Sequence, residues 1–394
     1  MTPLAAFRAD TRAWLEAHCP PSMRTPMPEE ERVWGGRHAS FRHPDSRRWL
    51  EAMVARGWTV PSWPREYGGG GLGREEAQVL KEEMQALGCR APLFGFGISM
   101  LGPVLLKYGT AAQKAEHLPR IARGEIRWCQ GYSEPGAGSD LASLQTRAED
   151  RGDHWLVNGQ KVWTSYAHLA DWIFCLVRTD TASKHGGISF LLFDMASPGV
   201  EARPIKLISG ASAFCETFFT NVQVPRENLV GRVNEGWTIA KELLQHERGM
   251  ISEIGRSIGG TVPSVEVIAR RTAGDARGTI GDPVLRDAVA RHVMDDHAFQ
   301  LTLQRAAAER AAGAAEGGLS SMFKYYGTEQ NKRKFELILK LAGTSALGWE
   351  GEDFTDEERL VCRTWLRSKG NSIEGGTSEI QLNVIAKRVL GLPD

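Results

Sequence analysis

Residues 131–140 read Gly-Tyr-Ser-Glu-Pro-Gly-Ala-Gly-Ser-Asp, which combines a pliable backbone with hydroxyl and carboxylate groups. Gly136 and Gly138 can adopt positive φ and bring their N–H groups close to another molecule. Ser133 and Ser139 supply hydroxyls that donate or accept hydrogen bonds. An ordinary tight turn is the alternative interpretation. The segment is therefore a candidate ligand-binding loop.

A carboxylate inside an apolar helical stripe is the second candidate for chemistry. Residues 239–258 predict a helix, and at about 100° per residue Glu247 falls near the centre of its apolar face. That face, about 140° wide, is formed by Ile239, Leu243, Leu244, Met250, Ile251, Ile254 and Ile258. A carboxylate there is costly unless it is paired or protonated. It is either half of a structural ion pair with a distant arginine or a general base whose pKa is raised by burial.

A third segment, residues 158–165, reads Asn-Gly-Gln-Lys-Val-Trp-Thr-Ser. Together with residues 131–140 it resembles the acyl-CoA dehydrogenase family. That family has a Ser/Thr-Glu-Pro-x-Ala-Gly-Ser-Asp loop followed by Asn-Gly-x-Lys-x-Trp-x-Thr/Ser. The resemblance covers essentially the full chain. It implies an FAD cofactor, an acyl-CoA substrate oxidised to a trans-2-enoyl-CoA, and an electron-transferring flavoprotein as electron acceptor.

The resemblance also guides the choice of the base that takes the proton from the α carbon. The family usually places a Glu just before a Gly-Thr pair near the C-terminus. Anchoring residues 373–381 on Gly376-Thr377 puts Gly375, which has no side chain, at that position. Some members, including isovaleryl-CoA dehydrogenases, instead carry the Glu on an earlier helix directly before an Arg. Glu247-Arg248 matches this second pattern, and Glu374, displaced by one place, is the rival.

The contacts to cofactor and substrate follow from the same resemblance. The Ser133 position hydrogen-bonds the flavin ring, the Trp163 indole lies beside the isoalloxazine, and Ser165 reaches its N5/O4 edge. The implied flavin-binding residues are Gln130, Tyr132, Ser133, Ser139, Trp163, Thr164, Ser165, Arg277, Thr377, Ser378 and Glu379. The implied substrate contacts are Ser139, Arg248, Gly375 and Gly376. For Arg248, a plain surface charge beside the stripe is the alternative.

Two segments depart from the family pattern that binds FAD across a subunit interface. Residues 277–281 keep the Arg and Gly of Arg-x-x-Phe-Gly but lack its Phe. Residues 339–344, Leu-Lys-Leu-Ala-Gly-Thr, lack the Gln of Gln-x-x-Gly-Gly. Two interpretations stay open: a tolerated variant in a homodimer or homotetramer, or a hetero-oligomer in which a related chain supplies the proper half.

Two other functions fit the same fold. One is an acyl-CoA oxidase or related flavin enzyme that uses O₂. The other is a helical assembly subunit that only holds a partner's flavin. The intact loop, Trp163, Ser165 and Glu247 argue against the assembly subunit, because a chain without activity has no need of them.

Whole-chain properties exclude several classes of protein. The 48 basic and 48 acidic residues balance, with pI ≈ 7.2, which argues against a nucleic-acid partner. No apolar run reaches the length of a membrane span, and the N-terminus lacks the core of a secretory signal. His292 and His297 are poorly spaced for a metal, so none is expected. The six cysteines show no CxxC spacing, which indicates reduced core residues of a cytoplasmic protein: Cys19, Cys89, Cys129, Cys175, Cys215 and Cys362.

The chain reads as an α+β, mainly α protein in three domains. Residues 1–126 predict an N-terminal helical domain, 127–230 a middle antiparallel β domain, and 231–394 a C-terminal four-helix bundle. Asn158-Gly159 between two apolar runs predicts a type I′ hairpin. The other expected strands are 172–177, 188–193, 200–205 and 217–224, and the expected helices include 3–18, 73–87, 306–315, 332–342 and 378–390.

Overall fold

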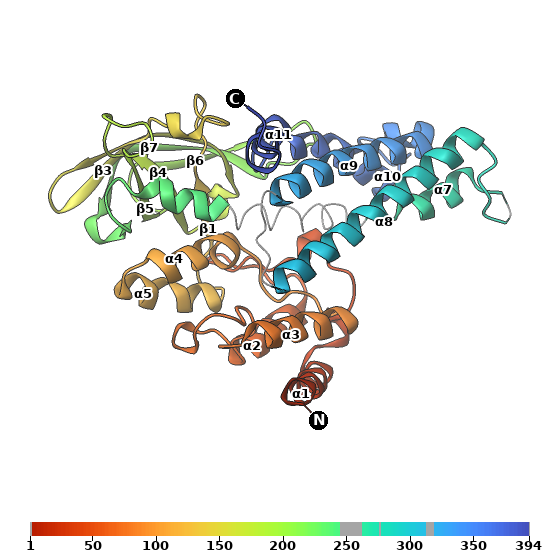
Figure 1. The fold of residues 1–394 in the computed structure, drawn as a ribbon, viewed down its shortest axis with the longest axis horizontal. Helices are drawn as coiled ribbons and strands as arrows, with labels where there is room; N and C mark the ends of the chain where they lie inside the picture. The colour runs from red at the N-terminus through yellow and green to blue at the C-terminus, as the bar shows by residue number, and fades with distance from the viewer. Residues whose placement is uncertain (1, 245–261, 276, 313–318, 394) are drawn as a thin grey trace. The chain divides into compact units, whose positions relative to one another are not determined.

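The computed structural model describes residues 2–244, 262–275, 277–312 and 319–393. They belong to two compact units: residues 1–205 with 213–244, and residues 206–212 with 245–394. Figure 1 shows the helices of the N-terminal part in red to orange, the strands in yellow to green, and the C-terminal helices in cyan to blue.

The first unit begins with five helices. Their bounds are α1 (Pro3–His18), α2 (Pro44–Ala55), α3 (Arg74–Ala86), α4 (Gly102–Tyr108) and α5 (Ala111–Ala122). Thr2 caps α1 and accepts the Ala5 N–H, with Pro3 in the first turn, as the sequence predicts. The glycine-rich run 68–71 is a loop around Trp63: the N–H of Gly71 donates to the Trp63 carbonyl at 2.9 Å. A side chain on Gly69 would meet that carbonyl at 2.1 Å, so glycine is required there.

An eight-stranded sheet completes the first unit. Its strands are β1 (Trp128–Gly131), β2 (Arg147–Asp150), β3 (His154–Ser165), β4 (Trp172–Arg178), β5 (Ile188–Asp194), β6 (Val200–Ile205), β7 (Phe214–Pro225) and β8 (Leu229–Val230). The order is β6-β7-β3-β2-β4-β5-β8, with β1 paired to β4. The sheet is not purely antiparallel, because β1–β4 and β2–β4 are parallel pairs.

The prediction of a hairpin turn at Asn158-Gly159 is wrong. Both residues lie inside the single strand β3, and the chain reverses at Gly152 (φ 91°), between β2 and β3. Gly159 is required for a different reason, since an added Cβ would meet the Thr146 Cα at 2.7 Å. The Asn158 side chain accepts the N–H of Asn221 on β7 at 2.8 Å. Asn-Gly therefore serves a close strand contact here.

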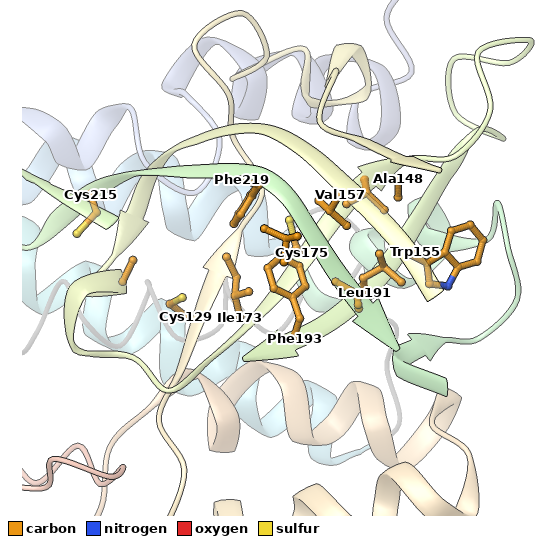
Figure 2. Close-up of a cluster of buried hydrophobic side chains, with 14 residues drawn as sticks. Cys129, Ala148, Trp155, Val157, Ile173, Cys175, Leu191, Phe193, Cys215 and Phe219 are labelled. Carbon is orange, nitrogen blue, oxygen red and sulfur yellow. The ribbon is translucent and has the colours of Figure 1, made fainter. Parts of the chain in front are cut away.

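The sheet encloses an apolar core of alternating inward side chains, shown in Figure 2. Trp155 and Val157 of β3, Ile173 of β4 and Phe193 of β5 are at most 2% exposed. Cys129, Cys175 and Cys215 are part of this core, and burial raises the pKa of the Cys175 thiol to about 12. All six cysteines are free; Cys19 is also buried, whereas Cys89 and Cys362 are only half-buried.

Buried polar groups join the helices to the sheet within the first unit. Gln113 of α5 donates to the carbonyls of Glu227 and Leu229 at 2.7 and 2.8 Å. Buried Asp171, just before β4, accepts the backbone N–H groups of Arg37 and Arg127. These bonds fix the start of the sheet against the N-terminal segment.

The second unit is helical where it is described. Its helices are α7 (Val265–Ala273), α8 (Pro283–Ala311), α9 (Leu319–Ala342), α10 (Asp356–Ser368) and α11 (Ser378–Val384). Phe335 and Ile338 of α9 are fully buried in its core, against Val265 and Ile268 of α7. Helices α8 and α9 both begin well before the expected 306 and 332. Among the described residues, no helix is both long enough and apolar enough to cross a bilayer.

His117 of α5 generates a prediction about pH. Its ring is fully buried edge-on against Trp128 and Trp172, and neither ring nitrogen has a hydrogen-bond partner in the described part of the chain. The Glu116 carboxylate lies 4.0 Å from Nε2. Burial lowers its pKa; Glu116 opposes this effect and Arg120 adds to it.

Because the folded pKa is depressed, the unfolded chain takes up the proton first as pH falls. The contribution of His117 to stability is complete above about pH 6.5 and is lost below it. Urea unfolding at several pH values should therefore show a flatter pH dependence for His117→Phe than for wild type. His38→Phe, at an exposed position, should keep the wild-type slope; identical slopes for all three proteins would contradict this expectation.

Candidate functional site

A buried ion pair connects the glycine-rich loop to β3. Lys161 is fully buried, and its ammonium lies 2.7 Å from the Glu134 carboxylate and 3.1 Å from the Tyr132 carbonyl oxygen. The Glu134 carboxylate also accepts the backbone N–H groups of Gln145 (2.6 Å) and Thr146 (2.9 Å). Burial alone would raise the Glu134 pKa, but the Lys161 charge and these bonds hold it below its ordinary value. Three chain segments thus meet at one carboxylate.

Hydrogen bonds close the loop into a turn, and its glycines leave the backbone accessible. Glu134 and Ala137 exchange two backbone hydrogen bonds, each 3.0 Å long. Between and just beyond them, Gly136 and Gly138 have open space where a side chain would stand. The loop therefore presents accessible backbone on the side away from the ion pair.

A β-bulge directly follows Lys161. The β3–β7 register shifts between Lys161 and Thr164, which adds one residue to β3. Trp163 in this bulge has φ 61°, a left-handed conformation that costs a non-glycine residue about 1–3 kcal/mol. Trp163 is 55% exposed, and its indole meets the Phe214 ring edge-on. The bulge turns a large flat side chain outward, as bulges near functional sites often do.

Hydrogen bonds hold both ends of the bulge. The Val162 N–H donates to the Ser133 carbonyl at 2.9 Å, which joins the bulge to the loop. At the other end, Tyr166 (φ 51°) donates its N–H to the Ala213 carbonyl at 2.7 Å, and the Arg127 guanidinium stacks on the Tyr166 ring. The loop and residues 162–166 therefore form one rigid face.

The structure distinguishes the side chains of this face. The Ser133 and Ser165 side chains are half-buried, and their hydroxyls make no hydrogen bond within the described residues. Ser139 is exposed. By contrast, Tyr132 packs its ring against Phe174 and Phe190, and Thr164 is fully buried. Tyr132 and Thr164 can reach a ligand only through their backbone.

Gln130 is half-buried on β1, opposite Phe174 of β4. Its place in the sheet puts it two residues before the loop turns away at Tyr132. It is therefore at the base of the same face.

The remaining predicted site residues belong to the second unit. Glu374 is bound: its carboxylate lies 2.7 Å from the Arg367 guanidinium and accepts the Asn371 side-chain N–H at 2.6 Å. Gly375 (φ 65°) and Gly376 (φ 91°) follow in left-handed conformations. Two partners on a half-buried carboxylate favour a structural role for Glu374.

Thr377 caps α11 by accepting the Ile380 N–H, and buried Ser378 donates to Glu329 at 2.9 Å. Glu379 is exposed in the first turn of α11. Near them, Lys324 of α9 is fully buried, with no partner for its ammonium in the described residues. Burial lowers its pKa, an effect that Glu374, Glu329 and Glu379 oppose.

Arg277 is exposed in a tight turn. The Asp275 carboxylate organises that turn by accepting the N–H groups of Arg277 and Thr279 at 2.8 and 2.9 Å. Residues 339–344 span the end of α9 and the start of a 3₁₀ helix, Gly343–Leu347. Neither segment contains an aromatic side chain.

Glu247 and Arg248 lie outside the described residues. Their helix is predicted over residues 239–258; in the structure residues 236–244 are helical, so it begins three residues earlier than expected. Ile239 and Leu243 are at most 1% exposed and Lys241 is exposed, as the apolar stripe predicts. Over the described ranges, no group of three or more His, Cys, Asp or Glu side chains is placed to hold a metal.

Comparison with known proteins identifies the family. Models of the N-terminal, middle and C-terminal domains of acyl-CoA dehydrogenases match residues 4–125, 129–222 and 234–390. Acyl-CoA dehydrogenase IpdE1 of Mycobacterium tuberculosis (strain ATCC 25618 / H37Rv) is 36% identical, over 100% of this chain and 99% of the relative. This chain belongs to the acyl-CoA dehydrogenase family. It is an oxidoreductase of a flavoprotein class whose members typically use FAD, and its substrate is an acyl-CoA.

Solved structures confirm the acyl-CoA dehydrogenase fold. The Tcur3481-Tcur3483 steroid ACAD has TM-score 0.78 and 29% identity, covering 100% of this chain and 99% of its own. The ChsE4-ChsE5 complex from Mycobacterium tuberculosis has TM-score 0.74 and 29% identity, with the same coverage. The expected order of helical, β and helical parts is therefore correct.

The face of the first unit fits a flavin. A flat ring system needs an exposed aromatic surface and hydrogen-bonding groups at its edge. Trp163 supplies the surface, and Ser133 and Ser165 supply hydroxyls with unused bonding capacity. The motif comparison assigned no role to Glu134 and Lys161. The sequence did contain a sign of this pair. Side chains alternate along a strand, so Lys161 faces the same buried side of β3 as Trp155 and Val157.

Removing one partner of this pair should be costly. Glu134→Gln leaves the Lys161 charge buried without a counter-charge, which we expect to lower the free energy of unfolding by about 3–5 kcal/mol. Glu201→Gln is the control, because Glu201 pairs with Arg203 on the exposed face of the same sheet. Denaturant unfolding of both variants should show a large loss for the first and almost none for the second. Equal losses would contradict a special role for burial.

Proposed function

We propose that this chain catalyses FAD-dependent α,β-dehydrogenation of an acyl-CoA thioester, with the flavin ring on the face formed by residues 131–139 and 162–166. The observation that supports this most directly is the outward Trp163 in its bulge, between two hydroxyls free to bond a ligand. When bound, FAD supplies the acceptor for the hydride that leaves the β carbon. Electrons then leave to an electron-transferring flavoprotein.

The chain's own residues divide the remaining work. Ser133 and Ser165 bind the ring edge, and Ser165 steadies charge that develops there. Ser139 and Arg248 contact the acyl-CoA. The backbone N–H of Gly375, in a turn with left-handed glycines, donates to the thioester oxygen and makes the α proton more acidic. Thr377, Ser378, Glu379 and Arg277 support the cofactor.

We assign the base to Glu247, which takes the α proton. The sequence pattern predicts that Glu247 lies on the apolar face of its helix, and the Glu-Arg pair matches one family pattern. The contacts of Glu374 support this choice, since a carboxylate that is hydrogen-bonded to Arg367 and Asn371 is a poor base. A carboxylate on the apolar stripe is desolvated, which strengthens it as a base.

The substrate and assembly are proposed from the relatives together with this sequence. Similar solved structures include the Tcur3481-Tcur3483 steroid ACAD and the ChsE4-ChsE5 complex. We infer a ring-bearing acyl group and a hetero-oligomer with a related chain. The incomplete FAD-binding patterns at 277–281 and 339–344 support the second inference, because a partner can supply the missing half.

The test of the base is anaerobic reduction. Purified Glu247→Gln protein should keep its flavin, but acyl-CoA should bleach that flavin about 10²–10⁴-fold more slowly than in wild type. Glu374→Gln, which keeps the hydrogen bond to Asn371, should bleach like wild type. A ring-bearing acyl-CoA should bleach wild type faster than a straight-chain one. Full bleaching of Glu247→Gln with loss in Glu374→Gln would reverse the assignment, and substrate-dependent peroxide in air would indicate an oxidase.

The test of the assembly is the flavin content. With its partner, the complex should hold about one flavin per two chains, since only one type of site is complete. Absorbance near about 450 nm with amino-acid analysis measures this ratio, and native mass spectrometry shows the chains present. A ratio near one per chain in an assembly of identical chains would contradict the hetero-oligomer.

A further inference from the structure

We propose that the buried Lys161–Glu134 pair is a positioning device that imposes the bulge at Trp163 and thereby sets the affinity for the flavin. This inference rests on the proposed function. It concerns two residues that touch neither substrate nor the reacting atoms in that scheme.

The pair controls the loop at consecutive positions. The Lys161 ammonium binds the Tyr132 carbonyl and the Glu134 carboxylate, and the next N–H along β3, from Val162, binds the Ser133 carbonyl. Side chain and backbone of residues 161–162 therefore hold 132, 133 and 134 together.

Glu134 extends the same control to a third segment. Its two oxygens accept the N–H groups of Gln145 and Thr146, at the entrance to β2. Gly159 leaves no room between β3 and Thr146, since an added Cβ would stand 2.7 Å from the Thr146 Oγ1. The loop, β2 and β3 are thus locked at one point beneath the ligand face.

Stability alone is a weak reason for such a pair. A buried ion pair is often no more stable than apolar residues of similar volume, whereas it restricts the geometries that satisfy it. Here the restricted geometry includes a tryptophan in the left-handed region, which persists only where the surroundings over-determine it. The bulge begins at the residue after Lys161. Because the pair carries no net charge, it acts through geometry.

The main test removes both charges together. In Glu134→Gln/Lys161→Met no buried charge is left unpaired, so the fold should persist. The protein, purified in the assembly it forms and stripped of flavin, is titrated with FAD while flavin fluorescence is followed. We expect at least tenfold weaker binding and brighter emission from the bound flavin, because Trp163 no longer quenches it by stacking.

The control is a partly buried pair of the first unit, buried Arg90 and half-buried Glu31, whose charged atoms lie 2.6 Å apart. Glu31→Gln/Arg90→Met should lower the melting temperature but leave the FAD affinity within twofold. Equal losses of affinity in the two double variants would overturn the proposal. So would wild-type affinity and emission in Glu134→Gln/Lys161→Met.

A second measurement needs no flavin. If the pair imposes the strained bulge, Trp163→Gly relieves strain only while the pair is present. The change in melting temperature caused by Trp163→Gly should therefore be more favourable in the wild-type background than in the double variant. The same change in both backgrounds would overturn the proposal.

If the double variant does not fold, Glu134→Asp replaces it. This variant keeps both charges but is one methylene too short to reach Lys161, Gln145 and Thr146 together, so weaker FAD binding is expected. Unchanged binding would overturn the proposal. A wild-type assembly that takes up no FAD would instead refute the proposed function itself, which separates the two failures.

Discussion

The constraint on which the first unit depends is the burial of a lysine and a glutamate beneath an otherwise apolar sheet. Burying the Lys161 ammonium is costly unless it is paired, and the segment 132–134 supplies a carboxylate and a carbonyl oxygen for it. These contacts hold the loop against β3. In our proposal this attachment imposes the bulge and turns the Trp163 indole outward, so that the ligand face is built on the sheet.

Much of this could be predicted from the sequence. The apolar runs of the strands and the start of the first helix at Thr2-Pro3 depend on short-range pattern or cap chemistry, and the structure has them in place. The hairpin at Asn158-Gly159 could not be settled this way. Asn-Gly fits a two-residue turn equally well as a strand position that needs no Cβ, and only the approach of Thr146 decides between them.

The same limit applies to the candidate site. Motif comparison selects Ser133, Trp163 and Ser165, but it cannot show that Thr164 turns inward, because the bulge reverses the alternation of β3 after Lys161. Nor can it show that Tyr132 packs inward, since its ring contacts Phe174 and Phe190 on strands distant in sequence. It also cannot show that Glu374 is bound by Arg367, since that bond depends on how α10 meets the following turn. Glu247 lies outside the described residues, so the case for it remains one of pattern and of the weakness of its rival.

The most direct measurement is a crystal structure of the FAD-loaded assembly. The isoalloxazine ring should lie against the Trp163 indole, with Ser133 and Ser165 hydrogen-bonded to its edge, and the Glu247 carboxylate should stand on the opposite side of the bound acyl chain. A flavin located away from Trp163, or a Glu247 side chain directed into solvent, would contradict the assignment of this face and of the base.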